Sequence, residues 1–274
     1  QMFEDLMTEL DRDQSPAFAQ FGRAVLADLS SDELDETAEA PRLAMLMRDI
    51  SDGLIPAGDQ FVSTDLHNQL IDHMAAFHVA FWGWEDTVGL SPIESRFGFF
   101  SDANIAREMA TDDPPVPIRV AQEGWARLPE RAPRLNALVQ EVRANPVALG
   151  NRLRATPLAF VAGDWKMGNL GSHPDGRTIV LDWAYPGASA PCLDLTWYLA
   201  INSARIPTSK QDTIAMFRAG LERRGIETDG WFDQQLGMSL LGAMTMLGWE
   251  KALGSDDELA WWEDAVIRSA SGAA

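Results

Sequence analysis

Apolar residues recur every three or four positions over residues 66–81, which is the spacing of one face of an α-helix. Similar spacing marks several shorter stretches. We therefore predict a long helix at 66–81 and further helices at residues 141–153 (interrupted near Pro146), 193–201, 210–224, 231–253 and 256–269. Three prolines, at positions 114, 115 and 117, predict a loop between the first two helices.

A different pattern interrupts the helices between residues 158 and 181. Residues 158–161 and 179–181 are short apolar runs, and the second run follows the turn sequence His173-Pro174-Asp175-Gly176. We expect these two runs to pair with each other as a hairpin. The chain is therefore predicted to be an α+β protein that is mostly helical and carries one short β-hairpin.

The charge of the chain narrows the partners that it can have. Its 274 residues include 41 Asp and Glu against 22 Lys and Arg, which gives a net charge of −19. A surface this acidic repels phosphate backbones and anionic lipids, so we expect neither nucleic acid nor a membrane among the partners. A cationic substrate is compatible with the same charge.

Cysteine content and the beginning of the chain bear on its location. Cys192 is the one cysteine, which excludes an intrachain disulfide and a multi-cysteine metal site and fits a reducing cytoplasm. The apolar stretch at residues 236–249 is too short to span a bilayer, and residues 1–5 do not resemble the start of a signal peptide. We therefore expect a cytoplasmic protein. Because the chain starts at Gln1, we expect it to be processed or part of a longer protein.

Several common catalytic motifs are absent from the sequence. No two glycines lie two positions apart, which excludes a dinucleotide-binding fingerprint and a glycine-rich kinase loop. A Gly-Lys pair and a G-x-S-x-G sequence are missing as well, so we expect neither a Walker-type phosphate loop nor a hydrolase elbow. His73 and His78 are five positions apart and point to different sides of the predicted helix, so we interpret both as structural.

The polar residues that indicate chemistry lie in and beside the β-rich segment. Asp164 and Asn169 form a D-x-x-x-x-N sequence directly after the first apolar run, and Asp182 directly follows the second. The expected hairpin would bring these three side chains together. Two carboxylates and an amide oxygen are ligands that a hard cation such as Mg²⁺ accepts, with phosphate and water completing its shell.

This arrangement resembles the catalytic core of aminoglycoside phosphotransferases and choline kinase relatives, within the protein-kinase-like superfamily. Their pattern is approximately H-G-D-x-x-x-x-N, followed by an apolar strand that ends in Asp. The resemblance implies that Asp164 is the catalytic base that accepts the proton of the substrate hydroxyl. It implies that Asn169 and Asp182 hold Mg²⁺ on the phosphates of ATP, and that Lys166 neutralises charge on the transferring phosphoryl group.

Other segments extend the resemblance over most of the chain. Residues 46–51 look like the end of the family's hinge strand, and residues 75–82 and 191–198 look like its helix before the catalytic loop and its helix after the metal-binding Asp. By this resemblance Met47 at the hinge and Leu181 on an apolar floor would hold adenine. Asp194 would brace the catalytic loop without taking part in the chemistry.

The sequence departs from the family pattern in two respects. Ala162 stands where the family has the His of H-G-D, which puts the rigidity of the loop in question. Residues 1–165 contain no lysine, so no small-lobe lysine is available to bind the α- and β-phosphates. We therefore expect residues 1–47 to be a remnant of the N-terminal lobe with the hinge strand. Residues 48–274 would form the helical C-terminal catalytic and substrate lobe.

The expected function is transfer of the γ-phosphoryl group of ATP, with Mg²⁺, to a small-molecule alcohol. The missing lysine and flap keep an alternative open, namely a non-catalytic pseudokinase or binding module, or an inactive fragment of a larger kinase. In related enzymes the later helices build the acceptor pocket, and here they carry acids and tryptophans. These are Trp249, Glu250, Asp256, Asp257, Glu258, Trp261, Trp262, Glu263 and Asp264. An amphipathic last helix packed on the core explains the same residues, and we favour that interpretation.

Overall fold

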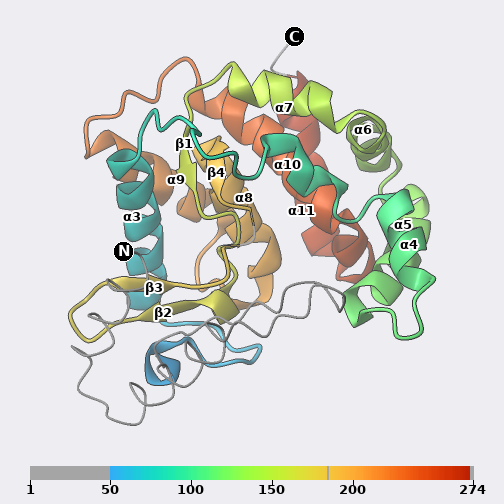
Figure 1. The fold of residues 1–274 in the computed structure, drawn as a ribbon, viewed down its shortest axis with the longest axis horizontal. Coiled ribbons are helices and arrows are strands. Elements are labelled where there is room, and N and C mark those ends of the chain that lie inside the picture. The colour runs from blue at the N-terminus through green and yellow to red at the C-terminus, as the bar shows by residue number, and fades with distance from the viewer. Residues whose placement is uncertain (1–49, 184, 272–274) are drawn as a thin grey trace, which may run out of the picture. The chain divides into compact units, whose positions relative to one another are not determined.

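The computed structural model describes residues 50–183 and 185–271, and most of these residues are helical (Figure 1). This confirms the prediction of a mostly helical α+β protein. The α-helices are α3 (Thr64–Ala80), α4 (Asp102–Met109), α5 (Val116–Arg131), α6 (Pro133–Ala144), α7 (Pro146–Arg154), α8 (Pro191–Ile201), α9 (Lys210–Glu222), α10 (Phe232–Leu253) and α11 (Asp256–Ser271). Four 3₁₀ helices are η1 (Ser51–Gly53), η2 (Ile93–Gly98), η3 (Met167–Asn169) and η4 (Ser203–Arg205).

Helix boundaries follow from side chains that cap the ends and from prolines in first turns. The Ser63 hydroxyl accepts a hydrogen bond from the Leu66 amide at 3.2 Å at the start of α3, and Ser209 caps α9 through the Asp212 amide in the same way. Pro146 begins α7, which is why the helical pattern breaks there. The predicted loop ends at Pro115. Pro117 lies in the first turn of α5, where proline costs no hydrogen bond.

The β-structure consists of two separate antiparallel pairs of three-residue strands. Strand β1 (Ala159–Val161) pairs with β4 (Gly187–Ser189), and β2 (Leu170–Ser172) pairs with β3 (Thr178–Val180). A hairpin was therefore predicted correctly, but its first strand was wrong. A turn of five residues can join only the strands that directly flank it, so β3 pairs with residues 170–172. Residues 159–161 precede the segment that carries the candidate residues 164–182 and pair with residues 187–189, which follow it.

Helix α10 is the centre of the hydrophobic core. It is apolar on all sides, and it packs against α5, α8, α11 and α6 (Figure 1). Gly124 of α5 allows a close approach to α10, because a Cβ atom at that position would lie 2.2 Å from the Trp249 carbonyl oxygen. The bundle around α10 therefore provides a rigid base for the segments that precede and follow it.

Helix α3 connects this core to the β-strands. It packs against α9, and Asp72 of α3 forms ion pairs with Arg223 and Arg224 at 2.8 and 2.7 Å. The helix also contacts β1 and β3, where His73 hydrogen-bonds the Thr178 hydroxyl at 2.8 Å. Consequently α3 places His73 against β3, and His78 contacts Asp194 of α8 at 3.2 Å.

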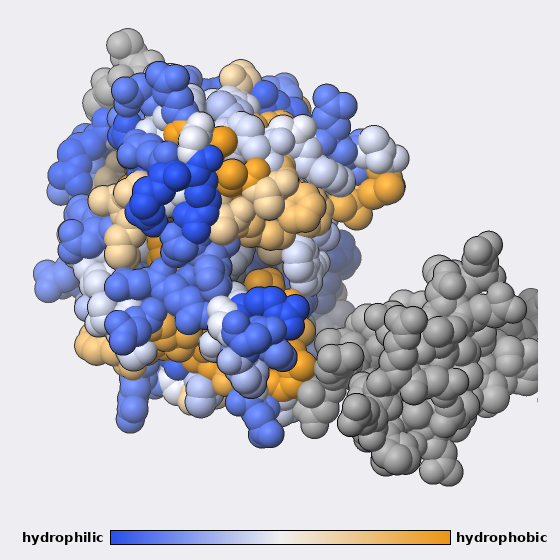
Figure 2. Space-filling model, turned by 90° about the vertical axis from the view of Figure 1, so that its left-hand side faces the viewer, coloured by the Kyte–Doolittle hydropathy of each residue, from blue (hydrophilic) through white to orange (hydrophobic). Residues whose placement is uncertain are grey.

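Contacts between Cα atoms divide the chain into Gln1–Ser51 and Asp52–Ala274. The boundary that the sequence predicted, between residues 47 and 48, lies outside the described residues and stays a prediction. Hydrophilic residues cover much of the face shown in Figure 2, with smaller apolar areas between them. Among the described helices, none combines the length and the apolar character that crossing a bilayer requires.

Candidate active site

The loop between β1 and β2 carries the first two candidate residues and holds them together. The Asn169 side-chain amide donates a hydrogen bond to Asp164 Oδ2 at 2.8 Å, and the Trp197 indole donates to Asp164 Oδ1 at 2.6 Å. Asp164 is half-buried, and burial raises its pKa, with the charge of Asp182 adding to the rise and the Trp197 bond opposing it. A raised pKa makes this carboxylate a better proton acceptor than an exposed Asp.

Three further predicted residues lie around this pair. The Leu181 amide donates to the Asn169 carbonyl at 2.8 Å, so the end of β3 lies beside the loop. Asp182 is exposed and adopts a φ of 51°, a left-handed conformation that Asp tolerates better than most residues. Lys166 is exposed, and its charge acts on Asp164. Met47, the other predicted adenine contact, lies outside the described residues.

Asp194, from the first turn of α8, holds the beginning of the loop. It is fully buried and accepts hydrogen bonds from the amides of Ala162 and Gly163, at 3.1 and 3.0 Å. It also accepts from the Trp165 indole at 2.9 Å and contacts His78 Nε2 at 3.2 Å. Burial alone would raise the pKa of Asp194, but the His78 hydrogen bond and the charge of Arg96 hold it below its ordinary value. The loop is therefore braced although residue 162 is an alanine.

Two residues that the sequence did not single out complete this bracing. Asn202 is buried just after α8, where its Oδ1 accepts from the Met167 amide at 2.7 Å and its Nδ2 donates to the Trp165 carbonyl at 2.9 Å. The buried guanidinium of Arg96 donates to the Gly163 carbonyl at 3.0 Å. Neither belongs to a recognisable motif, and each contacts the loop from at least 35 positions away in the chain.

The oxygen atoms of Asn169 and Asp182 are the ligands that the resemblance implies for Mg²⁺. The described residues contain no cluster of three or more His, Cys, Asp or Glu that could hold a metal by itself. Since the Asn169 amide nitrogen bonds Asp164, its Oδ1 is left as an acceptor, and Asp182 supplies an exposed carboxylate. One amide and one carboxylate suit Mg²⁺ that keeps water and takes its other ligands from substrate phosphates.

A cavity of about 510 Å³ lies beside the loop. Its lining includes Phe99, Arg107, Glu108, Ile118 and Tyr185. Tyr185 places it next to the loop that carries Asp164, because a Cβ atom on Gly163 would lie 2.5 Å from the Tyr185 carbonyl oxygen. Gly163 has a φ of 86°, so both the contact and the backbone conformation require glycine at this position.

No described residue of the last helix, α11, lines this cavity. Its residues Leu259, Trp262, Ala265 and Val266 are buried in the core, as the amphipathic interpretation predicted. Two of its five acids pair with basic residues, Asp256 with Arg131 and Glu258 with Lys210 at 2.5 Å. Glu263 accepts a hydrogen bond from the Leu135 amide at 3.2 Å, and Asp257 and Asp264 are exposed.

Comparison with known proteins yields similarity to solved structures only. No family model matches the chain, and no curated protein matches it. The choline kinase LicA from Streptococcus pneumoniae is similar with a TM-score of 0.40 and 12% identity, over 78% of this chain and 66% of that one. LicA in complex with AMP gives a TM-score of 0.40 and 13% identity, over 78% and 64% of the respective chains. This chain thus spans just under two thirds of their length, and at these values the similarity assigns neither a family nor an activity.

Proposed function

We propose that this protein is a phosphotransferase that moves the γ-phosphoryl group of ATP to the hydroxyl of a small-molecule alcohol. The observation that carries the proposal is the setting of Asp164. Its carboxylate is half-buried, has a raised pKa, and is fixed by Trp197 and Asn169 at the centre of a braced loop. Positioning and electrostatic stabilisation supply almost all of the catalysis in phosphoryl transfer, and a loop fixed in this way suits both.

Each predicted site residue has a role in this proposal. Asp164 accepts the proton of the acceptor hydroxyl, and Lys166 neutralises charge on the group in transit. Asn169 Oδ1 and the Asp182 carboxylate hold Mg²⁺, which when bound neutralises the nucleotide phosphates. Leu181 contacts the adenine, and the adenine contact expected of Met47 stays a prediction because Met47 lies outside the described residues.

The cavity beside Tyr185 is the place for the acceptor alcohol. An alcohol there would lie next to the segment that carries Asp164, with Phe99 and Ile118 against its apolar part. The net charge of −19 is compatible with a cationic alcohol, and a cytoplasmic location supplies both ATP and Mg²⁺.

A second function, nucleotide binding without turnover, is favoured by one observation. Residues 1–165 contain no lysine that could bind the α- and β-phosphates as a small-lobe lysine does. For the same reason we expect phosphoryl transfer by this chain to be slow, below about 1 s⁻¹, the low end of kinase rates. A longer chain that supplies such a lysine should be faster.

Variants of the two aspartates test the division of roles. Asp182→Ala should abolish Mg²⁺-dependent ATP binding measured by titration calorimetry. Asp164→Ala should leave the Kd for Mg-ATP unchanged and lower kcat by about 10²–10⁴, the usual contribution of general base catalysis. Asp175→Ala, in the exposed turn of the β2–β3 hairpin, is the matched control and should change neither quantity.

Two results would contradict the proposal. Equal loss of ATP affinity in Asp164→Ala and Asp182→Ala would show that the roles are wrongly assigned. Tight, Mg²⁺-dependent ATP binding with no transfer to a panel of amino, quaternary ammonium and sugar alcohols would support the binding function instead.

A further inference from the structure

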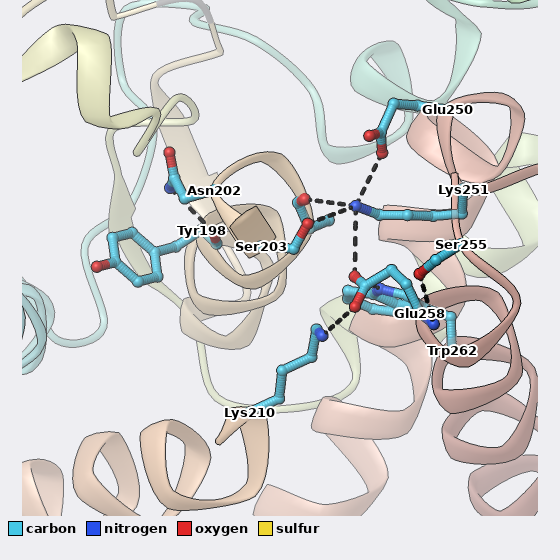
Figure 3. Close-up of polar contacts among 10 residues, drawn as sticks. Tyr198, Asn202, Ser203, Lys210, Glu250, Lys251, Ser255, Glu258 and Trp262 are labelled. Carbon is cyan, nitrogen blue, oxygen red and sulfur yellow. Dashed lines mark hydrogen bonds and ion pairs between the residues drawn. The ribbon is translucent and has the colours of Figure 1, made fainter. Parts of the chain in front are cut away.

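A buried lysine lies where the ends of three helices meet, away from the proposed reaction. The side chain of Lys251, near the end of α10, is only 1% exposed. Its ammonium group donates to the Ala200 carbonyl at 2.8 Å and to the Ser203 hydroxyl at 3.0 Å, and it forms ion pairs with Glu250 at 2.8 Å and Glu258 at 3.5 Å (Figure 3). None of the candidate catalytic residues is among these partners.

The charges around Lys251 balance. Lys210 pairs with the other oxygen of Glu258 at 2.5 Å, so two lysines face two glutamates, and the Trp262 indole also donates to Glu258 at 2.8 Å (Figure 3). Burial would raise the pKa of Glu258, but the Lys210 bond and the charge of Lys251 hold it below its ordinary value. A buried ammonium is tolerated only when paired and hydrogen-bonded in this way.

Two partners of Lys251, Ala200 and Ser203, lie before and after Asn202 in the chain. Ala200 is in the last turn of α8, where carbonyl groups without helical partners attract a cation, and Ser203 begins η4. Asn202 itself caps α8 and bonds Trp165 and Met167, the two neighbours of Lys166 in the loop. Fixing the backbone before and after Asn202 therefore fixes the side chain that holds the loop.

We propose that Lys251 is a positioning residue for the candidate active site: by fixing the chain around Asn202, it sets the position of the loop that carries Asp164, Lys166 and Asn169. The part of this inference that concerns turnover rests on the proposed phosphotransfer. The part that concerns loop position does not, because it can be measured without any activity.

Indole N–H resonances give the direct test, since Trp197 bonds Asp164 and Trp165 bonds Asp194. In ¹⁵N-labelled protein, Lys251→Met should move both resonances toward the position of an indole without a hydrogen bond. Asn202→Ala should move them in the same direction. Lys251→Arg keeps the charge and should move them less.

Lys210→Met is the matched control. Lys210 binds Glu258 and lies 4.9 Å from the centre of the Trp261 ring, and both of these partners belong to α11 and not to the chain around Asn202. This substitution removes one lysine from the same cluster and should leave the Trp197 and Trp165 resonances in place. Should Lys251→Met fail to fold, Ser203→Ala, which removes one of the four contacts, replaces it and should give a smaller displacement in the same direction.

Kinetics separate the inference from the proposed function. In a chain with transferase activity, Lys251→Met should lower kcat about 10- to 100-fold, as a misplaced loop does, and should also raise the KM for ATP, because the same loop carries Asn169. If Lys251→Met displaces the Trp165 and Trp197 resonances but the wild-type protein has no transferase activity, the proposed phosphotransfer is refuted and the positioning role of Lys251 is retained. Unchanged resonances in folded Lys251→Met and Ser203→Ala would overturn the inference.

Discussion

The bundle around α10 and the loop of residues 162–169 are held together by different forces. In the bundle, long helices satisfy their own backbone groups, and apolar side chains fill the space between them. The loop lies between three-residue strands, and its amides and carbonyls are satisfied by buried polar side chains, chiefly those of Asp194 and Asn202. A segment without regular structure must find such partners because an unpaired buried amide or carbonyl is costly.

This difference matters for function as well as for stability. The bundle tolerates changes of side chain that preserve volume, because apolar packing is not directional. Hydrogen bonds are directional, so the loop keeps one conformation only while its few partners are present. We expect single polar substitutions to act most strongly near the loop and single steric substitutions to act most strongly in the bundle.

Removing the main brace of the loop should have the largest effect. Asp194→Ala would leave the amides of Ala162 and Gly163 and the Trp165 indole without their acceptor, and would leave the charge of Arg96 less balanced. We expect the free energy of unfolding to fall by about 3–5 kcal/mol, the usual cost of removing one partner from a buried charged network. Urea unfolding followed by circular dichroism measures it.

Asp175→Ala is the control for this change, since Asp175 bonds only exposed groups at the hairpin turn. It should not move the urea midpoint. An Asp194→Ala protein that unfolds at the wild-type urea concentration would contradict the bracing role.

A steric change in the bundle should have the next largest effect. The extra methyl group of Gly124→Ala would lie 2.2 Å from the Trp249 carbonyl oxygen and would force α5 and α10 apart. Overpacking of this kind costs about 1–3 kcal/mol. Urea unfolding should show that loss, while Gly98→Ala, where the added methyl meets no atom within 4 Å, should show none. Equal stability of the two variants would mean that the α5–α10 contact adapts freely.

Acid should weaken the contact between α3 and α8 to a smaller extent. His67 is buried and bonds the Tyr198 hydroxyl at 2.9 Å and the Thr213 hydroxyl at 3.2 Å, and burial lowers its pKa to about 4. The unfolded chain binds a proton near pH 6.5 and the folded chain does not, so stability is lost as the pH falls from 7 toward 4. Between pH 7 and 5 this should amount to roughly 2 kcal/mol, or about 4–8 °C in Tm.

The pH series needs a comparison because carboxylates also titrate. His67→Gln should remove the part of the change of Tm with pH that is due to His67. His173→Gln, at the partly exposed hairpin turn, should retain that part. If the Tm of His67→Gln changes with pH as much as that of the wild type, His67 is not responsible for the loss of stability in acid.

Local patterns predicted most of the elements. The spacing of apolar residues at 66–81 corresponds to α3, and the later patterns correspond to α7–α11 within a few residues, because an amphipathic or buried helix repeats its signal over several turns. The helix expected at 141–153 covers only the last turn of α6, and α4 and α5 were not predicted. The pairing of residues 158–161 was predicted wrongly, because three-residue strands carry too little pattern to specify a partner. The 3₁₀ helix η2, which presents Arg96, has no periodic signal at all.

By itself, the sequence determined which residues can share one short loop. Asp164 and Asn169 are five positions apart, and Leu181 ends the strand that the Pro-Asp-Gly turn folds back beside them. Only the tertiary structure decided what holds that loop: Asp194, Asn202 and Arg96 reach it across 29 to 67 positions, and Lys251 reaches the chain around Asn202 across 48 to 51. The physical reason is that turn and helix signals arise between neighbours in the chain. The partner of a buried polar group is whichever side chain the packed helices bring within hydrogen-bond distance.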